Sequence, residues 1–163
     1  MELFNAEKLN QIRDILLQKK ETVAVAESVT SGFIQLALSQ PPNATEFFEG
    51  GLTAFNLGQK ARHLEVSPIL ADSCDSVSEE VAAQMAMKIN KSFMSTYGIS
   101  ITGYATCVPQ KNINSLYAYV SISYRGEIVH SEKIIADKKD EGLVCQLYYT
   151  QKIIAIFLNH LKK

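Results

Sequence analysis

The chain has 163 residues, 47% of them hydrophobic, which suffices for a single domain with one core, spanning residues 1–163. Its 17 acidic and 16 basic side chains nearly cancel and the lysines are scattered, so the sequence argues against nucleic acid as a partner. Because the amino terminus lacks a secretory signal pattern and no apolar run reaches the roughly 18 residues of a membrane span, we expect a soluble, cytoplasmic protein without membrane association.

The first third of the sequence predicts a helix, a strand, a helix and a strand, in that order. Asn5 is placed to cap a helix whose apolar residues recur at helical spacing up to Leu16. The uncharged, β-branched segment Thr22–Ala26 predicts a strand that is covered on both faces of a sheet. The next helix must end before Pro41, because proline cannot continue it, and Gly50–Phe55 is expected to form the second strand.

The remaining sequence predicts one long helix, three strands and a final helix. The long helix opens at Ser78 and runs to about Met94, and Gly98 is expected to break it. The later elements are expected over Ile99–Thr102, Leu116–Tyr124, Glu127–Ile135 and Asp140–Leu161. A hairpin turn at Arg125 and Gly126 joins the last two strands. This order predicts an α/β fold, a single domain with a mixed β-sheet and helices packed on both faces.

The cysteines and histidines show no pattern of a disulfide framework, a metal site or a catalytic base. They are isolated from one another in the sequence, at Cys74, Cys107 and Cys145 and at His63, His130 and His160. The chain also lacks a dinucleotide-binding Gly-x-Gly-x-x-Gly motif, a phosphate loop and an acidic metal cluster. We therefore expect no metal and no cofactor, and a site built from hydroxyl and amine groups.

Polar residues follow three of the predicted strands, where open α/β sheets gather their ligands. In the first junction, Glu27–Gly32, Ser28 is a candidate nucleophile and nearby N–H groups are candidates to bind a phosphate or an oxyanion. The same segment equally fits an ordinary helix N-cap. The second junction contains Lys60, and a partly desolvated lysine titrates low enough to take a serine proton. The third junction is Thr102–Gly103, a hydroxyl beside a glycine.

Five segments, taken in chain order and with their spacing, form one pattern. They are Thr22–Gly32, Phe47–Gly51, Lys60, Val77–Ala82 and Thr102–Gly103. Together they resemble the C-terminal domain of the competence/damage-inducible CinA family, over most of the chain. Active members of that family are nicotinamide mononucleotide deamidases. The resemblance implies a metal-independent amidohydrolase that converts nicotinamide mononucleotide and water to nicotinate mononucleotide and ammonia, in pyridine nucleotide salvage. The implied partner is thus a small-molecule substrate, a pyridine mononucleotide.

The resemblance also implies roles for individual residues. Ser28 would be the nucleophile, Lys60 the group that takes its proton, and Thr102 a supporting hydroxyl beside them. Backbone N–H groups at the start of the helix would bind the substrate. The implied substrate-binding residues are Glu27, Thr30, Ser31, Gly32, Gly50, Gly51, Phe55 and Gly103.

The chain departs from the family pattern at several places. Ser31 stands where the family has a glycine, and Phe55 where it has a tyrosine. The loop after Gly103 is bulky instead of glycine-rich, and the last helix lacks the family's arginines. Lys138 or Lys139 would replace the charge of such an arginine but not its bidentate contact with a phosphate. The alternative hypothesis is a divergent, non-catalytic module that binds a nucleotide or a protein partner, and a third is a structural role in an oligomer.

Tyrosines of the hairpin and the last helix provide a candidate surface for self-association. They are Tyr117, Tyr119, Tyr148 and Tyr149. Because such residues form self-complementary apolar patches, we expect a homodimer.

Overall fold

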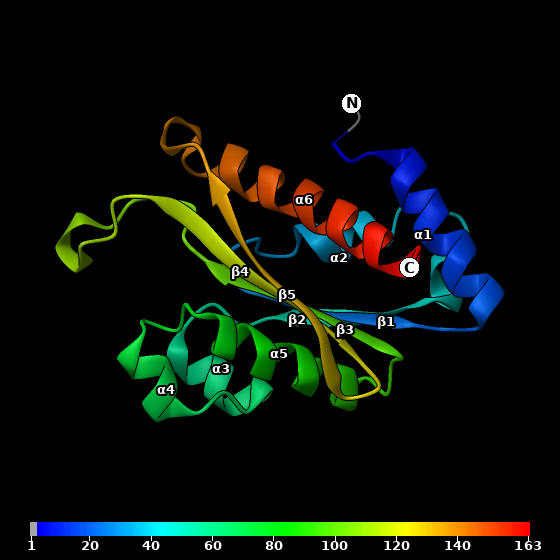
Figure 1. Cartoon of the computed structure of the whole chain (residues 1–163), viewed down its shortest axis with the longest axis horizontal. Helices are drawn as coiled ribbons and strands as arrows, with labels where there is room; N and C mark the ends of the chain where they lie inside the picture. Colours follow the sequence, from blue (N-terminus) through cyan, green and yellow to red (C-terminus); the bar gives the residue numbers. More distant parts are fainter. Residues whose placement is uncertain (1–2) are drawn as a thin grey trace.

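The computed structural model describes residues 3–163 and shows one five-stranded sheet between two layers of helices (Figure 1). The strands are β1 (Val23–Glu27), β2 (Phe48–Thr53), β3 (Tyr97–Gly103), β4 (Leu116–Tyr124) and β5 (Glu127–Ala136). They lie in the order β2-β1-β3-β4-β5. Strand β1 is parallel to β2 and β3, whereas β3, β4 and β5 pair antiparallel. The predicted α/β fold with a mixed sheet is therefore confirmed.

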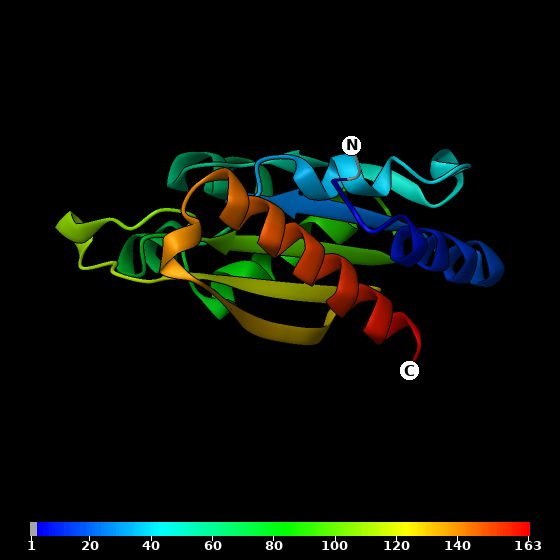
Figure 2. The same ribbon diagram turned by 90° about the horizontal axis from the view of Figure 1, so that it is seen from above.

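Helices cover both faces of the sheet, as predicted. On one face lie α1 (Ala6–Lys19), α2 (Phe33–Leu38) and α6 (Leu143–Leu161), and on the other α3 (Leu57–Leu64), α4 (Pro68–Ser73) and α5 (Glu79–Ser92) (Figure 1). Figure 2 shows α6 crossing the strands obliquely. Three short 3-10 helices are η1 (Ala44–Glu46), η2 (Pro109–Lys111) and η3 (Lys138–Asp140). Within residues 3–163 no helix combines the length and the apolar character needed to cross a bilayer.

Strand β1 lies inside the sheet, between β2 and β3, and its valines and alanines present apolar side chains to both faces. Val23 and Val25 pack into the core under α1, α2 and α6, while Ala24 and Ala26 pack into the core against α5. All five residues of the strand are buried, which confirms the expectation of a strand covered on both faces. Alternate side chains of a strand point to opposite faces, so one apolar strand supplies both cores.

The helix caps agree with the sequence, but some boundaries do not. Asn5 accepts the Lys8 N–H at 2.9 Å and Ser78 accepts the Val81 N–H at 3.1 Å, so both predicted caps are confirmed. The second strand begins two residues before Gly50, and α6 begins only after the 3-10 turn η3. Helices α3 and α4 were not expected.

Gly98 lies inside β3, so the prediction that it breaks the preceding helix is wrong. A Cβ atom at this position would come within 2.3 Å of the Ala86 carbonyl oxygen on α5. The glycine therefore lets α5 pack closely against the sheet. The helix itself ends earlier, at Ser92.

Candidate active site

A cavity of about 490 Å³ opens at the carboxyl ends of β1 and β3. Its walls come from the turn after β1, from α3 and α4, from the turn before α5, from the segment between β3 and β4, and from the start of α6. The segment between β3 and β4 extends past this end of the sheet (Figures 1 and 2). Ser28, Lys60 and Gly103, one from each predicted junction, all line the cavity.

Ser28 is presented at the cavity by a tight turn that follows β1. The Ser31 N–H donates to the Ser28 carbonyl oxygen at 3.1 Å, and Ser31 and Gly32 both take positive φ, +51° and +104°. From α6, the Gln146 side-chain amide donates to the Val29 carbonyl oxygen at 2.8 Å. The Ser28 side chain is nearly buried, and its hydroxyl has no hydrogen-bond partner among residues 3–163. The turn therefore fixes a hydroxyl that is free to react.

The carboxylate of Glu27 occupies the amino-terminal end of α2. It is fully buried and accepts hydrogen bonds from the Thr30 hydroxyl at 2.5 Å and from the N–H groups of Gly32, Ile34 and Gln35 at 3.0, 3.1 and 2.8 Å. A helix amino terminus binds anions through these N–H groups, and here the chain supplies the anion itself. The family resemblance implies that the Gly32 N–H binds the substrate, but this N–H is already paired with the Glu27 carboxylate.

The cavity contains only some of the predicted substrate-binding residues. Phe55 and Gly103 line it, and Phe55 is 66% exposed. The others lie outside the lining, namely Glu27, Thr30, Ser31, Gly32, Gly50 and Gly51. Gly51 serves strand packing, because a Cβ there would lie 2.3 Å from the Val25 carbonyl oxygen. Ser31, which replaces a family glycine, points to solvent and does not fill the cavity.

Lys60 reaches the cavity from α3. Asn56 caps this helix by accepting the Gln59 N–H at 3.0 Å, which fixes the first turn and the lysine in it. The Lys60 side chain is buried and forms no hydrogen bond or ion pair with any residue that the structure describes. Burial lowers the pKa of Lys60 to about 8, although Asp75 and Cys74 act in the opposite direction. About a tenth of the amine is thus neutral at pH 7 and about half at pH 8, far more than for an ordinary lysine.

Thr102 does not line the cavity but forms a hydrogen bond with Ser76, which does. Its hydroxyl, fully buried at the end of β3, donates to the Ser76 carbonyl oxygen at 2.7 Å. Ser76 and its neighbour Asp75 line the cavity, and both adopt the left-handed conformation, with φ of +59° and +53°. This conformation costs conformational free energy for residues other than glycine, so the hydrogen bond from Thr102 helps to hold a strained turn.

Asp75, Tyr104 and Lys111, which we call the Asp75 cluster, join two segments across the cavity. The Tyr104 hydroxyl donates to Asp75 Oδ2 at 2.9 Å, and Lys111 Nζ lies 2.6 Å from Asp75 Oδ1. Partial burial acts to raise the pKa of Asp75, but the hydrogen bonds from Lys111 and Tyr104 outweigh it and lower that pKa. Burial, together with the bond to Asp75, raises the pKa of Tyr104. All three residues line the cavity.

Sequence reasoning missed the Asp75 cluster and Gln146. The cluster joins residues that are 29 and 36 positions apart, so no local sequence pattern marks it. The only sign in the sequence was that the loop after Gly103 departs from the family pattern. Gln146 lies near the start of the last helix, the helix in which the family pattern has arginines and this chain has none.

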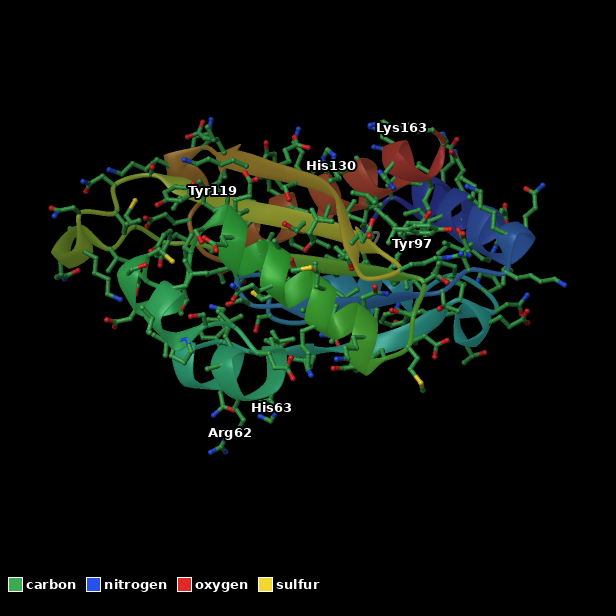
Figure 3. All side chains as sticks on the ribbon, turned by 60° about the horizontal axis from the view of Figure 1, so that its bottom comes forward. Arg62, His63, Tyr97, Tyr119, His130 and Lys163 are labelled. Carbon is green, nitrogen blue, oxygen red and sulfur yellow. The ribbon has the colours of Figure 1, made fainter. Side chains whose placement is uncertain are left out.

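The cavity lining contains few charges. Its basic residues are Lys60 and Lys111, and its acidic residues are Asp72 and Asp75. All of the arginines and the two lysines proposed to contact a phosphate lie outside the lining, namely Arg13, Arg62, Arg125, Lys138 and Lys139. Figure 3 shows Arg62 and His63 pointing away from the body of the protein. Over residues 3–163, no three His, Cys, Asp or Glu side chains gather closely enough to hold a metal ion.

Comparison with known proteins identifies the family. The sequence profile of the CinA C-terminal domain matches residues 5–145. A CinA-like protein of Dictyoglomus thermophilum is 31% identical over 122 residues, and one of Synechocystis is 37% identical over 91 residues. These matches cover 73% and 56% of this chain but only 29% and 22% of the two relatives, so the chain spans a minor part of their length.

Solved structures show the same fold. The competence or damage-inducible protein of Enterobacter asburiae has a TM-score of 0.88 at 24% identity, covering 95% of this chain and 96% of that one. The competence damage-inducible protein A of Klebsiella pneumoniae has a TM-score of 0.89 at 18% identity, covering 96% of each chain. With the profile match over most of the sequence, the chain belongs to the CinA C-terminal domain family.

Proposed function

We propose that this chain hydrolyses a carboxamide, with Ser28 as the nucleophile and Lys60 as the base. The observation that carries the proposal is that Ser28 and a buried Lys60, whose pKa is lowered to about 8, line the same cavity. A lysine that is partly neutral near neutral pH takes a proton from a serine hydroxyl. The CinA family includes nicotinamide mononucleotide deamidases, so a pyridine carboxamide is the proposed substrate, in cytoplasmic pyridine nucleotide salvage.

The proposed reaction has two halves. First, Ser28 Oγ attacks the amide carbon, Lys60 Nζ accepts the serine proton and passes it to the amide nitrogen, and the C–N bond breaks to release ammonia. An ester between Ser28 and the acyl group remains. Water then attacks the ester carbon, its proton passes through Lys60 to Ser28 Oγ, and the carboxylic acid leaves. Each cycle consumes one water and releases one ammonia and one acid, with the enzyme unchanged.

Both halves pass through an oxyanion that needs hydrogen-bond donors close to Ser28. Val29 lines the cavity, and its N–H makes no hydrogen bond to any residue in the described part of the chain. The residue after a nucleophilic serine supplies such a donor in other hydrolases. We assign the Val29 N–H to this role, with Gln146 as a positioning residue, because its 2.8 Å bond to the Val29 carbonyl oxygen fixes the turn.

The proposal is tested by incubating the protein with nicotinamide mononucleotide and measuring ammonia release. We expect turnover by the wild type and a loss of about 10³-fold or more in kcat for Ser28→Ala and for Lys60→Ala. Ser39→Ala and Lys88→Ala are matched controls, since both side chains lie outside the cavity lining, and they should retain wild-type rates. Absence of turnover by the wild type would rule out this substrate, and full activity of Ser28→Ala would rule out this nucleophile.

A non-catalytic binding module is the second candidate. It is favoured by Thr102, whose hydroxyl donates to the Ser76 carbonyl oxygen and lies outside the cavity lining, so it does not support Ser28 and Lys60 as the family resemblance implies. A nucleotide that raises the unfolding temperature without being hydrolysed would support this candidate over the enzyme.

A further inference from the structure

We propose that the cavity selects a cationic pyridinium carboxamide that carries no phosphate group, that is, the nucleoside in preference to the mononucleotide. The inference rests on the proposed function and narrows its substrate class. It is carried by the ion pair between Asp75 and Lys111 in the lining, by the position of the arginines outside it, and by the exposed ring of Phe55 at the cavity.

The helix that begins beside the cavity has no free amino terminus to offer a phosphate. The buried Glu27 carboxylate accepts the N–H groups of Gly32, Ile34 and Gln35. A phosphate at the same place would have to displace a buried carboxylate of the same sign. Like charges in a low-dielectric site repel strongly, so this position excludes a second anion.

The two cations of the lining are not free to bind a phosphate. Lys60 must be neutral to take the Ser28 proton, and a phosphate held beside it would stabilise its protonated form. Lys111 lies 2.6 Å from Asp75 Oδ1, and a phosphate oxygen that approached it would also approach this carboxylate. Within residues 3–163 the arginines lie outside the lining, so no guanidinium provides a bidentate phosphate contact.

Above about pH 8, where the proposed base is neutral, the remaining lining favours a positive charge. Lys60 is then uncharged and Lys111 balances Asp75, so the carboxylate of Asp72 leaves the lining with a net negative charge. The ring of Phe55 is 66% exposed at the cavity, and an aromatic face attracts a cation. An N-substituted pyridinium carboxamide carries one positive charge on its ring. The nucleoside carries only this positive charge, whereas in the mononucleotide the negative charge of the phosphate cancels or exceeds it.

The test compares nicotinamide riboside with nicotinamide mononucleotide. Binding is measured by calorimetry at about pH 9, where Lys60 is mainly neutral, on Ser28→Ala, which cannot turn over the ligand by the proposed route. The value of kcat/KM for ammonia release is measured on the wild type at the same pH. We expect the nucleoside to bind roughly tenfold more tightly than the mononucleotide. Equal or tighter binding of the mononucleotide, or no binding of either compound, would overturn the inference.

A substitution at Asp75 tests the cause of the preference. In Ser28→Ala, the further change Asp75→Asn frees Lys111 for a phosphate and removes a carboxylate, so the preference for the nucleoside should fall several-fold. Asparagine tolerates the left-handed conformation of residue 75, so the turn is preserved. Asp137→Asn is the matched control, because Asp137 pairs with Lys139 at 3.1 Å outside the cavity and the charge change is the same. An unchanged preference in Asp75→Asn contradicts the inference.

The outcomes separate this inference from the proposed function. Ser28-dependent hydrolysis that favours the mononucleotide would uphold the amidohydrolase and overturn the preference for a phosphate-free substrate. Tighter binding of the nucleoside without ammonia release from either compound would uphold the preference and contradict the proposed chemistry.

Discussion

The buried position of Lys60 sets the pH range in which the proposed base works. Burial lowers its pKa to about 8, and the carboxylate of Asp75 and the thiol of Cys74 raise it in part. The proton acceptor is the neutral amine, so kcat/KM should rise with pH through about 8 and then level off. A pH–rate profile of ammonia release between about pH 6 and 10 measures this inflection.

The Asp75→Asn variant tests whether the charge of Asp75 raises the pKa of Lys60. The Asp75 charge favours the protonated lysine, so its removal should move the inflection to a lower pH. Asp137→Asn carries the same charge change at an exposed pair outside the cavity and should leave the profile in place. An inflection that moves upward in Asp75→Asn, or equally in both variants, would contradict the assignment of the inflection to Lys60.

At the residue scale, the sequence predicted cavity residues that lie at or shortly after strand ends, and Lys60 in the helix that follows β2. Ser28, Phe55 and Gly103 lie at such strand ends, and the carboxyl ends of β1 and β3 meet at one edge of the sheet. The contact between Lys111 and Asp75 was not predictable, because the two residues are 36 positions apart and lie in irregular segments. Pairing between two turns leaves no periodic signal in a single sequence.

At the scale of elements, prediction succeeded where a segment was long enough to show a period. Val81, Met85 and Ile89 recur every four residues and are buried, whereas Met87 lies off this row and is 36% exposed. Helices α3 and α4 have only 8 and 6 residues, which is too short for a clear helical pattern. Helix α2 also has 6 residues, but Pro41 marked where it had to end. Gly98 was misassigned because a glycine that ends a helix and one that admits a close neighbour look the same in sequence.

The close packing of α5 on the sheet can be tested at Gly98. A Cβ there would come within 2.3 Å of the Ala86 carbonyl oxygen, so Gly98→Ala should lower the free energy of unfolding by about 2 kcal/mol or more. The matched change Gly58→Ala, in α3, meets its nearest atom at 3.6 Å and has no positive φ to lose. It should be neutral or stabilising by up to about 1 kcal/mol. Urea unfolding curves measure both values, and equal stability of the two variants would contradict this packing argument.

At the scale of the whole molecule, the expected tyrosine surface is only partly present. Tyr149 is fully buried and its hydroxyl donates to the Tyr104 carbonyl oxygen at 2.8 Å, so it cannot join a surface patch. The exposed apolar residues in this region are instead Ile135, Leu143 and Val144, which are 68%, 59% and 56% exposed. We call these three residues the β5–α6 patch, because they lie at the end of β5 and the start of α6.

The homodimer expected from the sequence is therefore proposed to form through the β5–α6 patch. Strand β5 is an edge strand of the sheet, and an apolar patch beside an unpaired edge favours self-association. Sedimentation velocity at micromolar concentration should show a dimer for the wild type and a shift toward monomer for Ile135→Lys. Ile69→Lys is the control, because Ile69 is 85% exposed on α4, in the helix layer on the other face of the sheet. A wild-type monomer, or an equal effect of both substitutions, would contradict this interface, since a contact made by one patch must respond only to a charge placed within it.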